Sequence, residues 1–185
     1  MQIKFIEKTM SYTGKELARH YILEHFSLSE DALISFIGKA DVKIEHMVDL
    51  IDVKNNAPIY SPSMLHFLGE FFNFTLFETI ALQRILIVII NEICEHEYSI
   101  KLKRIGDDLF YKNNAKLSVS IATKSPVSTL IHVGINIETK GTPVKTVGLQ
   151  ELKIPPKEFS LKVLEHFSGE IESMKFAKCK VRPVN

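Results

Sequence analysis

The chain has few cysteines and almost no net charge, and both absences exclude classes of protein. Its two cysteines, Cys94 and Cys179, form neither a Cys-x-x-Cys motif nor a cysteine and histidine cluster with metal-ligand spacing. We therefore expect no metal site. Lysine plus arginine number 23 and aspartate plus glutamate number 22, so the strong positive charge typical of nucleic-acid binders is missing. We expect no nucleic-acid partner.

Long apolar runs and common nucleotide or hydrolase motifs are also missing. The longest apolar run, ILIVII at residues 85–90, is far shorter than the roughly 20 residues that cross a bilayer. The N-terminal stretch MQIKFIEKTMSYTGKE mixes charged with apolar residues and lacks a signal-peptide core. The motifs GxGxxG, GxxxxGK(S/T), HExxH and GxSxG do not occur. We expect a cytoplasmic protein with no membrane partner.

The composition is that of an ordinary globular protein. Of the 185 residues, 45% are hydrophobic and 24% are charged, and no repeat, linker or low-complexity tract divides the chain. We expect one domain over residues 1–185.

The pattern of the chain predicts a mixture of strands and helices. Strands are expected at residues 2–7 and 31–44, and a helix is expected from a capping box at Thr13 and Glu16 to about Ser27. Residues 45–75 remain unassigned: MVDLIDV could be a short strand, and SPSMLHFLGEFFNF mixes aromatic residues with helix formers.

The second half gives clearer signals. The segment 76–97 has no Gly or Pro and is apolar around most of its circumference, which predicts a helix buried across a sheet or in a subunit interface. Pro155 and Pro156 suit the first turn of a last helix, and the closing AKCKVRPVN could be an edge strand. We predict an α/β (α+β) fold with a mixed or antiparallel central sheet flanked by helices.

Two runs in AKLSVSIATKSPVSTLIHVGINIE, residues 115–138, alternate as strands do and read as a β-hairpin. In the first run we expect one small, polar face, and in the second an opposing face that holds a histidine. If the strands pair, these faces form a low floor for a ligand. The residues predicted to form that floor are Lys116, Ser118, Ser120, His132, Gly134 and Asn136.

Lys116 and His132 are the candidate catalytic residues on this floor. An unpaired buried ammonium group is unfavourable, so Lys116 either faces solvent or stands in a ligand pocket, and its small neighbours favour the pocket. His132 is either a hydrogen-bonded structural residue or a general base. Asn136 could bind an amide, a carboxylate or a ring edge.

The turn RIGDDLFY adds further candidates. Asp107 and Asp108 are either a solvated bend or a source of one carboxylate for Lys116, since neighbours on an extended chain point apart. Arg104 precedes them in the same turn, and Lys39 and Asp41 are ligand-binding candidates in the strand at 31–44.

The stretches YTGKELARHYI, SPSMLHFLGEFF, QRILIVIINEI and RIGDDLFY resemble a prokaryotic family of conserved hypothetical proteins, domain of unknown function 366. A more distant resemblance is to biotin protein ligases and lipoate ligases, over roughly residues 76–138. There a helix precedes GDDL, AKLSVSIA and IHVGINI, in the order of the ligase motifs.

The ligase resemblance implies a small-molecule ligand and roles for several residues. Lys116 would contact acyl and phosphate groups, Asp108 would lie at the turn position, and Gly134 and Asn136 on the neighbouring strand. The ligases bind nucleotide phosphates with an Arg- and Gly-rich loop, whereas this chain has FIGKADVK at the comparable place. ATP is therefore a candidate cofactor, but the chain has no recognisable loop to bind its phosphates.

Two functions follow. The first is a ligase-like domain that binds an acyl or heterocyclic ligand and transfers it, with Lys116 stabilising negative charge and His132 or Asp108 moving a proton. The alternative is a non-catalytic binding or assembly protein that has lost the nucleotide loop, in which the apolar helix joins a homodimer.

Overall fold

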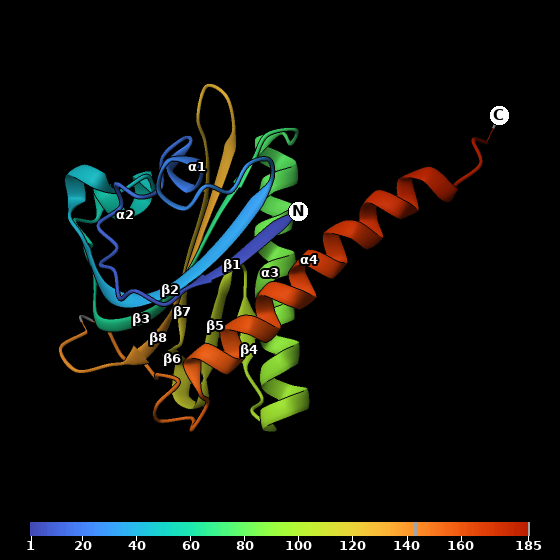
Figure 1. Cartoon of the computed structure of the whole chain (residues 1–185). Coiled ribbons are helices and arrows are strands. Elements are labelled where there is room, and N and C mark those ends of the chain that lie inside the picture. Colours follow the sequence, from blue (N-terminus) through green and yellow to red (C-terminus); the bar gives the residue numbers. More distant parts are fainter. Residues whose placement is uncertain (143, 185) are drawn as a thin grey trace.

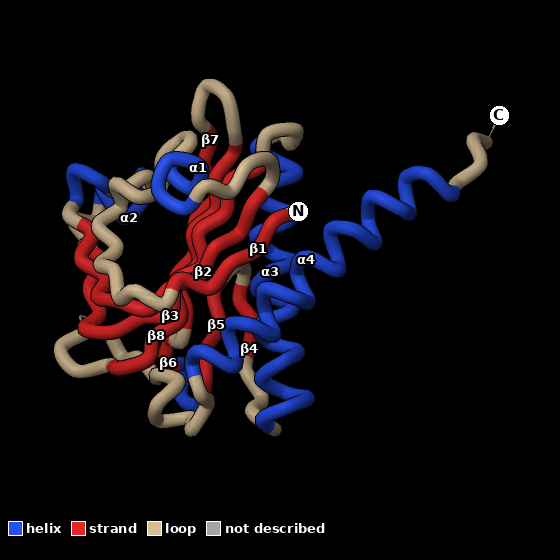
Figure 2. Tube along the Cα trace, viewed as in Figure 1, coloured by secondary structure: helices blue, strands red, loops and turns tan. Residues whose placement is uncertain are grey.

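A computed structural model describes residues 1–142 and 144–184, which form an open mixed sheet flanked by helices (Figures 1 and 2). The five-stranded sheet has the order β1-β2-β3-β8-β7, with β1 parallel to β2 and the other pairs antiparallel. Its strands are β1 (Gln2–Ile6), β2 (Ala32–Val42), β3 (Ile59–Phe71), β7 (Ser118–Lys124) and β8 (Thr129–Glu138). A three-stranded sheet contains β4 (Lys103–Ile105), β5 (Asp108–Tyr111) and β6 (Ala115–Lys116).

One face of the large sheet is covered by two long helices, as Figure 1 shows. These are α3 (Leu76–Tyr98) and α4 (Pro156–Lys180). Both were predicted; α3 begins with a capping box between Thr75 and Glu78, and α4 has a proline in its first turn. Leu86 and Ile90 of α3 and Phe159 of α4 are buried in the core beneath them. The apolar helix α3 is thus buried within this chain.

The other face is only partly covered, which leaves room for a pocket. The segment before β2 and the helix α1 (Tyr21–Phe26) cover part of it, and Ile22 is buried there with Phe36 and Leu68. A 3₁₀ helix, η1 (Ile44–His46), and α2 (Leu50–Lys54) cross the same side between β2 and β3.

The predicted helix at 13–27 is much shorter than expected. Thr13 and Glu16 do hydrogen-bond as in a capping box, but turns follow and α1 begins only at Tyr21. His20 has a φ of 60°, which interrupts the helix, and its backbone N–H donates to the buried Glu70 carboxylate. A long-range contact therefore overrides the local helix signal.

Two further expectations are corrected. Within MVDLIDV the residues 50–53 belong to α2, because the Asp49 side chain accepts from the N–H groups of Ile51 and Asp52 at the start of the helix. The closing AKCKVRPVN forms no edge strand among its described residues: 177–180 lie in α4, 181–184 are irregular, and 185 lies outside the described residues.

The unassigned stretch SPSMLHFLGEFF is the central strand β3, which pairs with β2 and β8. Pro62 lies next to irregularities in both pairings, consistent with the confinement of strand prolines to bulges and edges. On either side of the irregularities the register is continuous, so β3 aligns the two strands that flank the pocket.

Candidate functional site

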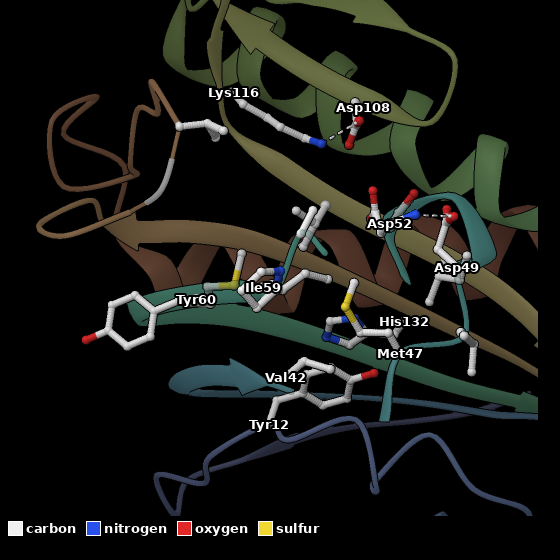
Figure 3. A pocket seen from close by; sticks show the side chains of 18 of the residues that line it. Tyr12, Val42, Met47, Asp49, Asp52, Ile59, Tyr60, Asp108, Lys116 and His132 are labelled. Carbon is white, nitrogen blue, oxygen red and sulfur yellow. Dashed lines mark hydrogen bonds and ion pairs between the residues drawn. The ribbon is translucent and has the colours of Figure 1, made fainter. Parts of the chain in front are cut away.

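A pocket of about 520 Å³ lies on the partly covered face of the sheet (Figure 3). Its volume is within the range of small-molecule sites, roughly 300–1,000 Å³. The segment from His46 to Tyr60 forms one wall, and the small sheet with the chain after β8 forms another. Most of its lining is apolar, with side chains such as Val42, Ile59 and Ile121.

The floor of the pocket contains a buried aromatic stack. The rings of Tyr12 and His132 lie 3.7 Å apart at an angle of 7°. His132 Nε2 lies 3.0 Å from His66 Nδ1, and His66 Nε2 lies 3.2 Å from the carbonyl oxygen of Gly38. Burial lowers the pKa of His66 to about 4 and the pKa of His132 well below its usual value, so both rings are neutral at pH 7.

Gly38 allows the chain to place Tyr12 over His132. Met10 and Tyr12 donate backbone hydrogen bonds to Ile37 and Lys39, so this segment runs closely along β2. A Cβ on Gly38 would lie 1.6 Å from the carbonyl oxygen of Met10. Only glycine fits at this approach, so this one glycine of FIGKADVK has a clear packing role.

Lys116 extends into the pocket from the small sheet and is paired there. Its Nζ lies 2.8 Å from Asp108 Oδ2, and both side chains are about a quarter to a third exposed (Figure 3). Burial raises the pKa of the Asp108 carboxyl, while Lys116 opposes this and Asp107 and Asp52 add to it. Of the two adjacent aspartates, Asp108 is therefore the one that binds the lysine.

Asp107 lies in the same pocket but turns toward α3. Its Oδ2 accepts hydrogen bonds from Gln83 Nε2 at 3.0 Å and Ser120 Oγ at 3.1 Å, and Arg84 lies 3.5 Å from its Oδ1. The adjacent carboxylates thus point apart, as an extended chain predicts. Asp107 joins the hairpin turn to the helix, leaving Asp108 to face the ligand space.

The residue pairing corrects the predicted floor. Val119 lies opposite Gly134 and Ile121 opposite His132, so these four share the pocket face. Ser118 and Ser120 lie opposite Ile135 and Val133, on the face that packs against α3.

Two of these predicted floor residues have structural partners. The hydroxyl oxygen of the fully buried Ser118 accepts a hydrogen bond from the Leu109 N–H. Ser120 reaches only the margin of the pocket, beside Asp107. At Gly134 a Cβ would meet Met64 and Val119 side chains, so packing accounts for this glycine.

Other candidates divide between the pocket and its surroundings. Asn136 lines the pocket, and its Nδ2 donates to the Lys116 carbonyl at 3.3 Å. Lys39 and Asp41 bind each other at 2.6 Å on the surface and are not among the residues that line the pocket. Arg104 is exposed and donates to the carbonyl of Gly106.

Most of the lining residues were not predicted, among them Tyr12, Asp49, Asp52 and Met64. Asp52 lies near Lys116, which lowers its pKa, whereas burial and Asp49 raise it more strongly. The one usable signal in the sequence was Asp49, an N-cap residue before LID. His66 also lies on this face but could not be placed while β3 was unassigned.

The charged groups that line the pocket are mostly acidic. Asp49, Asp52, Asp107 and Asp108 line it together with Lys116, and the described lining residues include no arginine. The described part of the chain contains no group of three or more His, Cys, Asp or Glu side chains placed to hold a metal ion. In the same described residues, no helix is long and apolar enough to cross a membrane.

Three comparisons show a family and relatives of unassigned function. A sequence profile described as "Domain of unknown function (DUF366)" matches residues 1–182. "Uncharacterized protein MJ0805" of Methanocaldococcus jannaschii is 41% identical over 160 residues, which are 83% of this chain and 72% of that protein. A solved "Protein of Unknown Function from Pyrococcus horikoshi" is 36% identical, with a TM-score of 0.94 over 100% of this chain and 99% of that one.

More distant solved structures share the fold. A biotin protein ligase from Aquifex aeolicus, in complex with biotin and ATP, has a TM-score of 0.64 and 17% identity over 94% of this chain and 72% of that one. A putative lipoate protein ligase from T. acidophilum, with bound lipoic acid, has a TM-score of 0.59 and 10% identity over 93% and 87%. The predicted ligase-like fold is thereby confirmed.

Proposed function

The chain belongs to the DUF366 family, and from its pocket we propose that it binds a small organic molecule, an acyl or heterocyclic compound, whose polar end meets Lys116. The observation that supports this most is the Lys116 and Asp108 pair beside an apolar pocket of about 520 Å³. Breaking a partly exposed ion pair costs little free energy. A ligand carboxylate can therefore replace Asp108 as the partner of the lysine. An apolar ligand body then fills the space over Val119 and Ile121.

The ligases with this fold give the proposal its ligand class. The Aquifex aeolicus enzyme was solved with biotin and ATP, and the T. acidophilum protein with lipoic acid. Both organic acids have an apolar body and a carboxylate. We propose the same type of ligand here.

The pocket supports binding more strongly than acid–base catalysis. His132, the predicted base, is buried against Tyr12 and uses Nε2 to contact His66. A pKa lowered well below the usual value makes it a weak base at neutral pH. We propose that His132 binds and positions the ligand, and that transfer chemistry, where it occurs, depends on Lys116 and Asp108.

The proposal is tested by thermal unfolding with biotin, lipoic acid and octanoic acid, alone and with Mg-ATP. A bound ligand raises the melting temperature by mass action. Lys116→Met should remove the increase, whereas Lys101→Met, at an exposed lysine outside the pocket, should keep it. Native mass spectrometry of the purified protein provides a second readout, since a retained small molecule would add to the mass. No increase with any acid and no added mass would contradict the proposal.

We also propose a homodimer, now through α4 in place of α3. The C-terminal part of α4 extends away from the sheet (Figure 1) and exposes Met174 and Phe176, which is 66% accessible. A second copy could cover these side chains, as isologous contacts do in most dimers. Light scattering should give twice the chain mass, and Phe176→Glu should give a monomer. A monomeric wild-type protein would contradict this proposal.

A further inference from the structure

The ring of His132 has one nitrogen without a hydrogen-bond partner among the residues that the structure describes. His132 is 3% exposed and lines the pocket, where Figure 3 places it beside Tyr12. Its Nε2 contacts His66 Nδ1, and among the described residues Nδ1 of His132 has no hydrogen-bond partner. A buried polar atom without a partner is unfavourable unless a ligand or water supplies one.

The positions of the ring hydrogens on His66 and His132 follow from the backbone carbonyl of Gly38, which His66 contacts. The carbonyl oxygen of Gly38 can only accept, so His66 Nε2 carries a hydrogen and donates to it. In the neutral ring His66 Nδ1 is then an acceptor, and His132 Nε2 must donate to it. His132 Nδ1 is left with a free lone pair. The backbone of β2 thus sets the tautomer of a ring on β8.

The free nitrogen is open to the pocket. The sealed side-chain atoms without a partner in the described chain are His20 Nδ1, Asn91 Oδ1 and Tyr98 Oη, and His132 Nδ1 is not among them. Since His132 contributes to the pocket lining while its flat face is covered by Tyr12, the remaining access is along the ring edge.

Three other polar groups of the pocket also offer acceptors. The Asn136 amide donates to the Lys116 carbonyl through Nδ2, which leaves Oδ1 as an acceptor. Asp52 and Asp108 contribute carboxylates, and Lys116 is already shared with Asp108. A ligand that satisfies these groups must itself bring donors.

We propose that the pocket selects a ligand whose ring carries N–H or O–H donors, one of which hydrogen-bonds to His132 Nδ1. Cyclic ureas, lactams and amino-substituted heterocycles meet this requirement, whereas a plain acyl chain or a dithiolane ring does not. The inference rests on the ligand-binding function proposed above and narrows it to one class of ligand.

The first test concerns the free protein and needs no ligand. Long-range ¹H–¹⁵N spectra of the histidine rings at pH 7 distinguish a protonated from an unprotonated ring nitrogen. We expect His66 and His132 both to carry hydrogen on Nε2, with Nδ1 bare. Hydrogen on His132 Nδ1 would overturn the inference and leave the binding proposal intact.

The second test separates donor recognition from binding as such. Desthiobiotin, its analogue methylated on both ring nitrogens, lipoic acid and octanoic acid are titrated by calorimetry. These are carboxylic acids that differ in ring donors. We expect desthiobiotin to bind at least about tenfold more tightly than the other three, the value of one well-formed hydrogen bond. Equal affinities would overturn the inference but support ligand binding, and no binding by any of the four would overturn both proposals.

A pair of variants assigns the effect to the ring nitrogen. His132→Phe keeps an aromatic ring against Tyr12 but removes the acceptor, and it should abolish the preference for desthiobiotin over its methylated analogue. His132→Asn retains an acceptor and should keep part of that preference if it folds. A preference that survives in His132→Phe would overturn the assignment. His25→Phe, at an exposed histidine outside the pocket, is the matched control.

Discussion

Gly38 and Met10 approach so closely that a Cβ on Gly38 would lie 1.6 Å from the Met10 carbonyl oxygen. This approach holds the segment that carries Tyr12 along β2, and through it the cover of His132. This one glycine of β2 therefore determines how the segment that covers the floor of the pocket packs on the sheet.

Replacement of this glycine should destabilise the protein. Gly38→Ala must displace backbone, so we expect the free energy of unfolding to fall by about 1–3 kcal/mol, typical of overpacking. Gly169→Ala is the control, because a Cβ there meets nothing within 4 Å and alanine favours the helix. Urea unfolding should show a loss for the first and a gain of up to about 1 kcal/mol for the second. Equal stabilities would contradict the close approach.

Removal of the lysine should change the acidity of the aspartate that it binds. The pKa of Asp108 is raised by burial and lowered by Lys116. In Lys116→Met only the raising effects remain, so the pKa of Asp108 should rise further. The pKa of Asp52 should also rise, because Lys116 lowers it too. Carboxyl ¹³C shifts followed over pH measure both, with Lys101→Met as the control. An unchanged Asp108 would mean that the ion pair does not form in solution.

The buried histidines should make the protein less stable in acid. Burial lowers the pKa of His66 from 6.5 to about 4, so the unfolded chain binds a proton in a pH range where the folded protein does not. The contribution of the neutral His66 ring to the free energy of unfolding is complete above pH 6.5 and is lost as the pH falls toward 4. For one histidine this difference corresponds to about 3 kcal/mol. His132, whose pKa is also lowered, should add to the loss.

Denaturant unfolding between pH 7 and 4 measures this dependence. In His66→Gln, which cannot ionise, the free energy of unfolding should fall less steeply over that range. The same slope in wild type and variant would show that His66 does not titrate as its burial implies. Carboxylates contribute to both proteins alike, so the difference in slope comes from the two histidines, because His66 also lowers the pKa of His132.

The sequence predicted the helices and strands better than it predicted the side of the sheet on which each side chain lies. Alternation correctly indicated β7 and β8, and the absence of Gly and Pro correctly indicated α3. However, alternation within one strand does not reveal the register between two strands, that is, which residues lie opposite each other. The pairing of Val119 with Gly134 sends Ser118 to the α3 side, against expectation. Lys116 still reaches the pocket because it belongs to β6, in the other sheet.

Residues joined across long distances in sequence could not be predicted. Tyr12, His66 and His132 meet only when β3 is known to lie between β2 and β8. The composition of β3, which includes Pro62 as well as Met, Leu and Glu, does not indicate a strand, because tertiary pairing decides its conformation. The lysine, its aspartate partner and Asn136 could be found because they lie close together in one hairpin region.

ATP provides the final prediction, since its phosphates require cations. The described lining of the pocket offers one lysine, Lys116, beside Asp49, Asp52, Asp107 and Asp108. One ammonium group can pair with a single ligand carboxylate, whereas the several negative charges of a triphosphate would remain unpaired beside these aspartates and are disfavoured by like charge. We expect Mg-ATP to raise the melting temperature no more than adenosine does at the same concentration, since the two differ in the phosphates and their metal. A larger increase with Mg-ATP that disappears in Lys116→Met would show instead that the lysine binds phosphate, and would favour adenylate formation over simple binding. Magnesium chloride alone is the control, because the ion could act on the aspartates without nucleotide.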